Sequence, residues 1–489
     1  DDYANEQAIQ SYLWALEALG DAPNDSRIWE TREALGDVLC TLGRYDQAQR
    51  EYAALLAGGR RQEAQPLPPA VSAEVLRSWG DALEKQGRYS DALEKLRQAE
   101  QICDEAINEV PPLLLSAIYA DMGMVLFRLG EYDQALQICQ AGLTKIRDDR
   151  RSAEDERIEA DLQQLIGNIH GMRGQYDQAR FHFENALAAQ EAIDDLFGCS
   201  RLQNNLGYLA ILQSDYARAV RHYEQAEVLA RKVQAKYVLG SVLLNLAESY
   251  CRLDRSAEAE QACGESLALF HEMGDRDGIA KAYDTLGLIA DSRGEYPLAL
   301  EHYRQALILH RALESSYQEG NSLVQIAAVK NALACPAEAR ELARSAHQIG
   351  ERIQAPQLQL EALNVLAEAD LLSAGTGPDA EGLLSQAAEL AAQAAELADQ
   401  LGSRRDYGVA RRLQGQIAAR RHEPADLHFL AAESVMRAVR SDRELARTWA
   451  CYGAYLAERN PDAAAAYLSQ AEEIFRRINA NATLRRVIA

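Results

Sequence analysis

Small and apolar residues recur along the chain in a pattern that predicts pairs of amphipathic helices. In residues 282–307, two stripes at helical spacing comprise Ala282, Leu286, Ile289 and Ala290, and then Ala299, Tyr303, Ala306 and Leu307. Gly294 lies between the stripes, where the end of a helix commonly needs a residue in the left-handed conformation. Gly287 and Ala299 lack bulk, so we expect the two helices to approach each other closely. This stretch therefore predicts two helices joined by a short turn.

The same arrangement returns along most of the chain, each time around a small residue. These residues are Gly36, Gly80, Gly123, Gly167, Gly207, Ala247, Gly287, Ala327, Ala367, Gly415 and Gly453. Gly36, Gly80, Gly123, Gly167 and Gly287 are followed by Gly-x-Tyr and then Ala, and the other copies are weaker. From Gly167 to Ala367 the small residues stand about 40 residues apart. A lone helix pair cannot bury its apolar stripe, whereas stacking on the next pair buries it. The chain is therefore predicted to be an all-α solenoid of about 11 helix-turn-helix repeats.

The repeated pattern resembles the tetratricopeptide repeat over essentially the whole chain. One copy reads Leu286-Gly287, Gly294, Tyr296, Ala299, Tyr303 and Ala306. Repeats of about 40 residues exceed the usual length of about 34 in that family. They are similar to those of kinesin light chains and of the helical sensor regions of large bacterial regulators. The resemblance implies a right-handed superhelix whose concave face is lined by the first helix of each pair.

Three segments are expected along the chain. Residues 1–20 carry Ala8, Tyr12 and Ala15 at the spacing of a second helix, so we expect a truncated repeat and a fragment of a longer protein. Residues 21–345 are expected to form a regular array. Residues 346–489 are expected to continue it less regularly, because the stretch from Ser373 to Pro378 lengthens one turn.

The composition narrows the classes of partner. The 489 residues carry a net charge of −23, which disfavours binding to nucleic-acid phosphates and to anionic membranes. An acidic chain suits a basic partner. No apolar run approaches the roughly 18 residues of a membrane span, and no secretory signal opens the chain, so we expect a cytoplasmic location. The 8 cysteines form no CxxC pair and are expected to be reduced, buried thiols.

Motifs for chemistry are absent from the sequence. There is no GxxxxGK[ST] phosphate loop and no HExxH zinc motif. His182 and His222 lie on predicted helices without partners at metal-ligand spacing. We therefore expect no catalytic residue, no metal and no cofactor in this chain, and any enzymatic activity would belong to domains outside it.

Candidate binding residues are polar side chains on predicted first helices that packing does not require. The segment 203–207 reads Gln-Asn-Asn-Leu-Gly and resembles the Asn-Asn-Leu segment of kinesin light chain repeats, which implies that an Asn meets a peptide backbone in the groove. An amide can both donate to and accept from such a backbone. The concave-face candidates are Asn205, Asn245, Asn204, Arg201, Tyr208, Glu248, Asn168, Gln164, Gln325 and Asp121. Each of them could instead face solvent or bond a helix end.

The opening residues suggest a context for the repeats. Residues 3–9, Tyr-Ala-Asn-Glu-Gln-Ala-Ile, followed by Tyr12 and Leu16, resemble the junction of bacterial STAND-type ATPases and cyclase-linked regulators. The resemblance implies a sensor or partner-recruiting region that follows an ATPase module and binds a protein or peptide. A free-standing adaptor that assembles a protein complex is the alternative. A superhelix that senses a small molecule is a further alternative, which two aromatic side chains in one concave pocket would support, with Tyr208 as the candidate.

Overall fold

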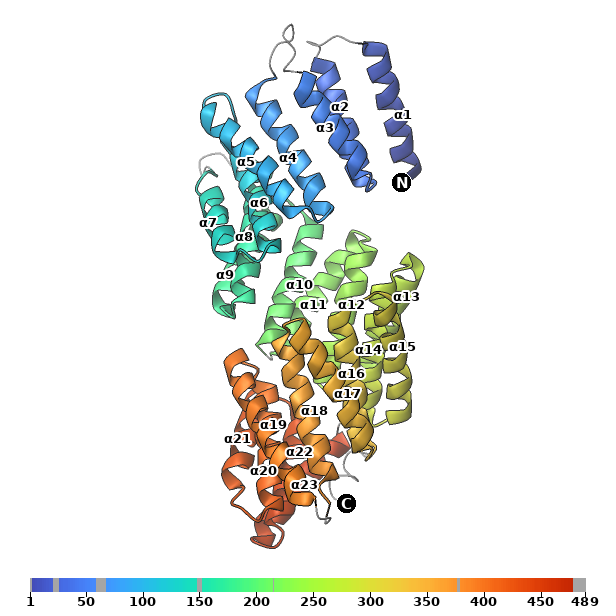
Figure 1. Ribbon diagram of the computed structural model, residues 1–489, viewed down its shortest axis with the longest axis vertical. Coiled ribbons are helices and arrows are strands. Elements are labelled where there is room, and N and C mark those ends of the chain that lie inside the picture. The colour runs from blue at the N-terminus through green and yellow to red at the C-terminus, as the bar shows by residue number, and fades with distance from the viewer. Residues whose placement is uncertain are drawn as a thin grey trace. The chain divides into compact units, whose positions relative to one another are not determined.

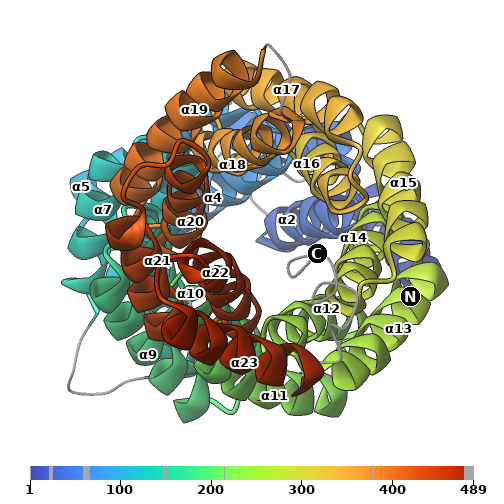
Figure 2. The ribbon, with the colours of Figure 1, turned by 90° about the horizontal axis from the view of Figure 1, so that it is seen from below.

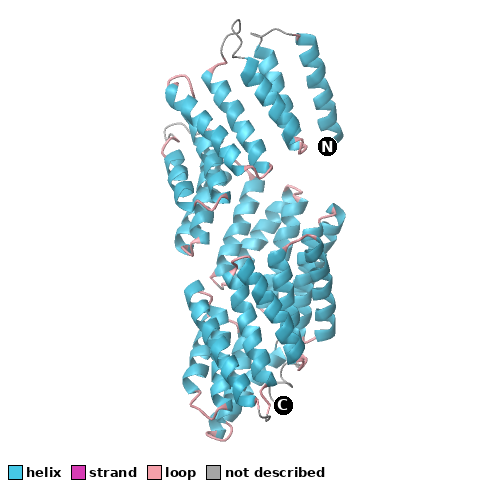
Figure 3. Cartoon of the chain, viewed as in Figure 1, coloured by secondary structure: helices cyan, strands magenta, loops and turns pink. Residues whose placement is uncertain are grey.

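The computed structural model describes residues 2–20, 26–58, 67–146, 152–213, 215–375 and 379–477. This described part contains 23 α-helices and no strand (Figures 1 and 3). Helix α1 (Asp2–Leu19) comes first, and the other helices follow as 11 consecutive pairs. The predicted all-helical solenoid of about 11 repeats is therefore confirmed.

The chain divides into two compact units, Asp1–Gly198 and Cys199–Ala489. In the first unit, the first helices of the pairs are α2 (Ser26–Thr41), α4 (Pro69–Lys85), α6 (Pro112–Arg128) and α8 (Ala153–Met172). Their second helices are α3 (Tyr45–Gly58), α5 (Tyr89–Glu105), α7 (Tyr132–Leu143) and α9 (Tyr176–Ala192). This division lies after Gly198 and does not test the expected loss of regularity after residue 345, which stays a prediction.

The second unit contains most of α10 (Leu196–Leu212) and the helices that follow it. Its further first helices are α12 (Lys236–Arg252), α14 (Arg276–Arg293), α16 (Ser316–Ala332), α18 (Pro356–Ser373), α20 (Arg404–Arg420) and α22 (Asp442–Leu456). Its second helices are α11 (Tyr216–Lys232), α13 (Ser256–Met273), α15 (Tyr296–Ala312), α17 (Pro336–Arg352), α19 (Ala380–Leu401), α21 (Asp426–Ala438) and α23 (Pro461–Arg477). The long turn predicted at 373–378 falls between α18 and α19, and its residues 376–378 lie outside the described residues.

In several pairs a glycine of the first helix meets a large side chain of the second helix at close range. A Cβ added at Gly207 would lie 2.5 Å from the ring of Tyr223, and one at Gly287 would lie 2.6 Å from the ring of Tyr303. Both tyrosines are only 1% exposed. The glycines are therefore required for the close approach that the sequence pattern predicts.

The turns between paired helices use the left-handed conformation. Gly294 ends α14 with φ 76°, as predicted from its place between the two apolar stripes. Other turns of the second unit place residues with side chains in this conformation, among them Asp254 with φ 58° and Arg440 with φ 52°. These turns are short, so successive helices run antiparallel and stack as hairpins.

The first helices line the inner side of each stack. Consecutive first helices such as α4 and α6, or α12 and α14, contact each other, whereas broad contacts between consecutive second helices are absent from the described part. The stack therefore bends with its first helices inside, and Figure 2 shows α12, α14, α16 and α18 inside α13, α15, α17 and α19 in the second unit. We call the side formed by the first helices the inner face.

Two sequence expectations about the chain as a whole can be compared with this fold. No helix among the described residues is both long and apolar enough to span a bilayer. All cysteines are free, and six of them are buried, namely Cys40, Cys103, Cys139, Cys199, Cys251 and Cys263. Burial raises the pKa of the Cys139 thiol to about 12, so this group is an unreactive part of the core.

Replacing Gly287 with Ala is expected to lower the free energy of unfolding by about 1–3 kcal/mol, because the new methyl group would clash with the ring of Tyr303. Gly264 on α13 is the matched control, since a Cβ there meets no atom within 4 Å. Gly264→Ala is expected to stabilise the protein by about 0.5–1 kcal/mol through helix propensity. Urea unfolding of both variants checks the pair, and equal effects would contradict the packing role of Gly287.

Candidate partner-binding site

The ten predicted binding residues all lie on first helices. In the first unit, Asp121 lies on α6, and Gln164 and Asn168 lie on α8. In the second unit, Arg201, Asn204, Asn205 and Tyr208 lie on α10, Asn245 and Glu248 on α12, and Gln325 on α16. Because the set is divided between the two units, the inner face of each unit is described by itself.

Asp121 lies in an acidic part of the inner face of the first unit. Its carboxylate oxygen Oδ2 lies 3.1 Å from Nε of Arg77 on α4. Burial, together with nearby Asp81 and Asp161, raises the pKa of Asp121 to about 7 despite the attraction of Arg77. The first helices therefore bring together more carboxylates than one arginine can neutralise.

A second acidic group of the first unit lies on α2. Burial and the neighbouring carboxylates of Asp37, Glu74 and Glu30 raise the pKa of Glu33 to about 7. These acidic residues carry no distinct sequence signal, because carboxylates are common along the whole chain and only the stacking of first helices shows which of them converge. The inner face of this unit is therefore suited to cationic groups.

The predicted asparagines of the second unit contact each other. Nδ2 of Asn245 donates a hydrogen bond of 2.9 Å to Oδ1 of Asn204, which joins α12 to α10. Asn205 is half-buried on the same inner face. Glu248 accepts a hydrogen bond of 3.2 Å from Arg252, one helical turn further along α12. Asn204 and Asn245 thus meet between α10 and α12, and the binding role of all six predicted residues on these helices stays a prediction.

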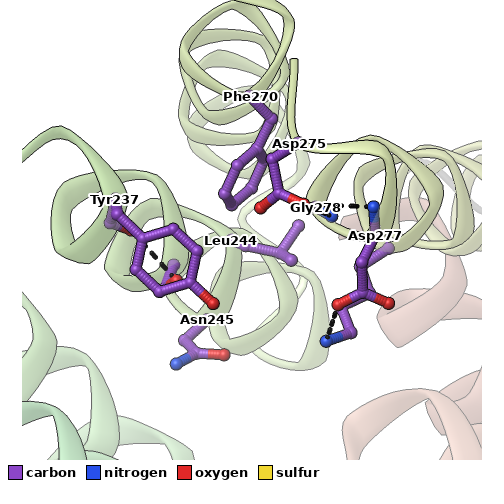
Figure 4. A pocket seen from close by; sticks show the side chains of 9 residues that line it. Tyr237, Leu244, Asn245, Phe270, Asp275, Asp277 and Gly278 are labelled. Carbon is purple, nitrogen blue, oxygen red and sulfur yellow. Dashed lines mark hydrogen bonds and ion pairs between the residues drawn. The ribbon is translucent and has the colours of Figure 1, made fainter. Parts of the chain in front are cut away.

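A pocket opens beside Asn245, between α12 and α14. Its volume is about 130 Å³, and it is lined by Tyr237, Ser241, Leu244, Asn245, Phe270, Asp275, Asp277, Gly278 and Lys281. In Figure 4 the hydroxyl of Tyr237 lies near the amide of Asn245, and the carboxylates of Asp275 and Asp277 stand across the pocket. Of the ten predicted residues, only Asn245 lines this pocket.

The polar groups of the pocket are mostly hydrogen-bond acceptors. Asp275 caps α14, and its Oδ1 accepts from the backbone N–H groups of Asp277 and Gly278 at 3.1 Å each. Oδ2 of Asp277 pairs with Nζ of Lys281 at 2.5 Å, so the one cation of the pocket is already neutralised. Tyr237 is 63% exposed at the mouth, whereas Phe270 is 2% exposed. The pocket thus combines aromatic walls with carboxylate and amide oxygens.

The repeat register could have identified the aromatic residue of the pocket. Tyr237 and Tyr317 occupy equivalent places at the start of α12 and α16, and Asp277 takes that place in α14. Tyr317 is 44% exposed, and burial, Glu361 and Tyr208 raise its pKa to about 12. Tyr208, which is 57% exposed, is among the groups that raise the pKa of Tyr317, and it does not line the pocket beside Asn245.

Glu361 on α18 is a further carboxylate of this inner face that the sequence analysis missed. Its Oε1 accepts a hydrogen bond of 3.0 Å from Nε2 of Gln357, which also donates to Oδ2 of Asp406 at 3.1 Å. Burial and the negative charge of Asp406 raise the pKa of Glu361 to about 7, against the opposite influence of Gln357, Arg252 and Arg405.

The two histidines that the sequence singled out take part in packing between paired helices. Nδ1 of His182 lies 2.6 Å from Oε1 of Gln163, and Nδ1 of His222 lies 2.8 Å from Oε1 of Gln203. Burial lowers the pKa of both histidines. Within the described ranges, no group of three or more His, Cys, Asp or Glu side chains is placed to hold a metal ion.

Replacing Glu361 with Gln is expected to raise the melting temperature at pH 8 and to have little effect below pH 4.5. The folded protein holds the Glu361 proton more tightly than a free carboxyl of pKa 4.5 does, so its stability falls as the pH rises from about 4.5 to about 7. Gln removes this dependence and can keep the hydrogen bond to Gln357. Thermal unfolding from pH 4 to 8 tests it, with Glu301→Gln on the outer helix α15 as the control, and parallel curves for Glu361→Gln and the wild type would refute it.

Sequence comparison identifies the repeats over part of the chain. The tetratricopeptide repeat profile matches residues 158–232 and 239–312. A protein of Arabidopsis thaliana named kinesin light chain-related 3 is 22% identical over 275 residues. That match covers 55% of this chain and 41% of the relative, so the chain spans less than half of the relative's length.

Solved structures share the fold at low sequence identity. A Rap protein complexed with competence and sporulation factor aligns with 75% of this chain and 99% of its own, with a TM-score of 0.55 and 14% identity. The apo form of RapI aligns with 77% of this chain and 98% of its own, with a TM-score of 0.57 and 13% identity. These likenesses show the helical-repeat fold.

Proposed function

Because the chain contains tetratricopeptide repeats, we propose that its inner faces bind a segment of a partner protein or peptide. The pocket beside Asn245 is the single observation that carries this proposal. It adjoins the predicted asparagines, it opens on the inner face, and it offers both apolar walls and oxygen acceptors. These properties suit one anchoring side chain of a longer guest.

The size of the pocket favours a side chain over a whole small molecule. Pockets for drug-sized ligands are usually about 300–1,000 Å³ in volume. The pocket here has about 130 Å³, although Tyr237 and Phe270 give it the two aromatic walls that a small-molecule site would need. A sensor of small molecules is therefore the weaker alternative. An extended chain that places one residue in the pocket and continues along the inner face fits the volume better.

The asparagines provide contacts for a peptide backbone. Asn245 uses its Nδ2 for Asn204, which leaves its Oδ1 as an acceptor for a backbone N–H group. Asn205 lies on α10, which is the first helix of the preceding pair. Contacts to the backbone tolerate different guest sequences, so specificity would come from the pocket and from charge.

The charge of the inner faces supports a basic partner segment. Burial and neighbouring carboxylates raise the pKa values of Glu33 and Asp121 in the first unit to about 7. Lysine or arginine side chains of a guest would relieve this repulsion. Nucleic acids and anionic membranes do not fit such surfaces.

For the wider role, we propose the sensor or partner-recruiting region of a larger cytoplasmic signalling protein of the STAND type. An adaptor that assembles a protein complex is the alternative. The likeness of residues 3–9 and Tyr12 to the junction after an ATPase module supports the first reading. Finding an upstream phosphate-binding loop in the same reading frame would favour the sensor, and its absence from the complete gene would favour the adaptor. Neither role assigns catalysis to the repeats.

The double variant Asn205→Ala/Asn245→Ala is expected to weaken partner binding about tenfold, which corresponds to about 1.4 kcal/mol. Its free energy of unfolding is expected to fall by no more than about 1 kcal/mol, because only the hydrogen bond from Asn245 to Asn204 is lost. The measurement is affinity capture by the intact protein from extracts of its source, followed by mass spectrometry and by titration with the purified partner.

The control is Gln261→Ala/Gln305→Ala, which removes two exposed amides from the outer helices α13 and α15. This variant is expected to bind the partner as the wild type does. If the two double variants bind equally well, the inner face of α10 and α12 is not the binding surface.

A further inference from the structure

The second unit contains a contact between helices that lie far apart in the sequence. Arg443, in the first turn of α22, donates a hydrogen bond to the backbone carbonyl oxygen of Ser292, near the end of α14. These residues are 151 positions apart. Both belong to the same compact unit, and Figure 2 shows α22 on the inner side of the curve that begins with α12 and α14. The helices of this unit therefore curve until a late repeat meets an early one.

The charges on the two sides of this contact are complementary. Burial and the nearby carboxylate of Asp442 raise the pKa of Asp254 to about 6, whereas Arg443 and Arg477 act to lower it. Burial and Glu444 raise the pKa of Asp291, which Arg443, Arg447 and Arg252 act to lower. Most of the cations that face these two carboxylates thus come from α22 and α23, although α22 also brings two carboxylates of its own. Without α22, the ends of α12 and α14 would keep two half-buried carboxylates with few cations nearby.

The contact is made by side chains and not by a packed helix interface. The apolar side of α22 packs against α20, α21 and α23, and α22 has no broad interface with α12 or α14 among the described residues. A pocket of about 470 Å³ remains between the two sides, lined by Leu253 and Asp254 on one and by Arg437, Arg440, Asp442 and Leu445 on the other. Breaking the contact therefore exposes little apolar surface, so its cost is mainly electrostatic.

Arginines of α22 also reach a position of the inner face that corresponds to a predicted binding residue. Nη2 of Arg447 donates to Oε1 of Glu368 at 3.0 Å. In the 40-residue register of these repeats, Glu368 on α18 is equivalent to Glu248 on α12. The carboxylates of this inner face are thus met by arginines of the chain itself.

We propose that α22 is a reversible ionic latch, which holds the curve of the second unit closed and occupies inner-face carboxylates that a basic partner segment would otherwise meet. The latch stands on the contact of Arg443 with Ser292, while the competition with a basic guest rests on the function proposed above. Partner binding and latch opening are then coupled, since a guest that prefers the open unit shifts the equilibrium toward it.

Hydrogen exchange of the intact chain tests the latch without any partner. In Arg443→Gln, the amides at the end of α14 and in the α12–α13 turn are expected to exchange about tenfold faster than in the wild type. In the wild type, raising the NaCl concentration from 50 to 500 mM is expected to accelerate the same amides, because salt screens ion pairs. Amides of α16 and α17 are expected to keep their rates in both experiments.

Arg344→Gln is the matched control, because it removes the same charge from the outer helix α17, away from the latch. Arg344 is exposed and makes no ion pair or hydrogen bond through its side chain within the described part of the chain. Rates in Arg443→Gln that equal those of Arg344→Gln, together with wild-type rates that do not respond to salt, would overturn the latch. A global rise in exchange would signal loss of folding, in which case the salt response of the wild type decides.

Binding of a hexa-arginine peptide tests the competition. Arg443→Gln is expected to bind this probe at least about threefold more tightly than Arg344→Gln, although both variants have the same net charge. Equal affinities would overturn the competition. Loss of binding in both variants and in the wild type would overturn the basic-partner proposal as well, while the exchange experiment would still report on the latch.

Discussion

The contact between a glycine on one helix and a large side chain on its partner sets how closely the two helices of a pair approach. Gly287 under Tyr303, like Gly207 under Tyr223, lets two helix backbones approach more closely than any residue with a Cβ would allow. Pairs of one shape stack in one way, and this stacking brings consecutive first helices together on one side. The inner face is therefore a consequence of packing, and its polar residues are the part of the sequence that packing leaves free.

The sequence was sufficient for the fold because its signals are local. The left-handed turn at Gly294 and the small residue Gly287 lie within one repeat, and the same pattern recurs along the chain. The candidate site was only partly predictable. Asn245 could be assigned to the inner face from its place before Leu246, but the pocket beside it needs Asp275 and Phe270, which belong to the next turn and to an outer helix. Those neighbours follow from how two pairs dock, which a pattern of single residues does not contain.

Contacts between distant repeats are harder still to predict. The hydrogen bond from Arg443 to Ser292 depends on the curvature summed over all the pairs between α14 and α22. A small change in the angle at each junction would move the two residues far apart. The sequence of a single repeat does not determine the total curvature. Repeat spacing therefore predicts which residues share a face, and leaves open which residues meet across it.

Curvature also explains why the inner faces are electrostatically unusual. First helices that converge bring their carboxylates together, and each unit responds differently. In the first unit, burial and neighbouring carboxylates raise the pKa values of Glu33 and Asp121, and Arg77 offsets only part of the effect on Asp121. In the second unit Glu444 is 3% exposed, yet Arg447, Arg412 and Arg405 lower its pKa although burial alone would raise it. A basic segment would therefore add missing cations in the first unit, but would have to displace the chain's own arginines in the second. The inner faces of the two units thus have different thresholds for the same kind of guest.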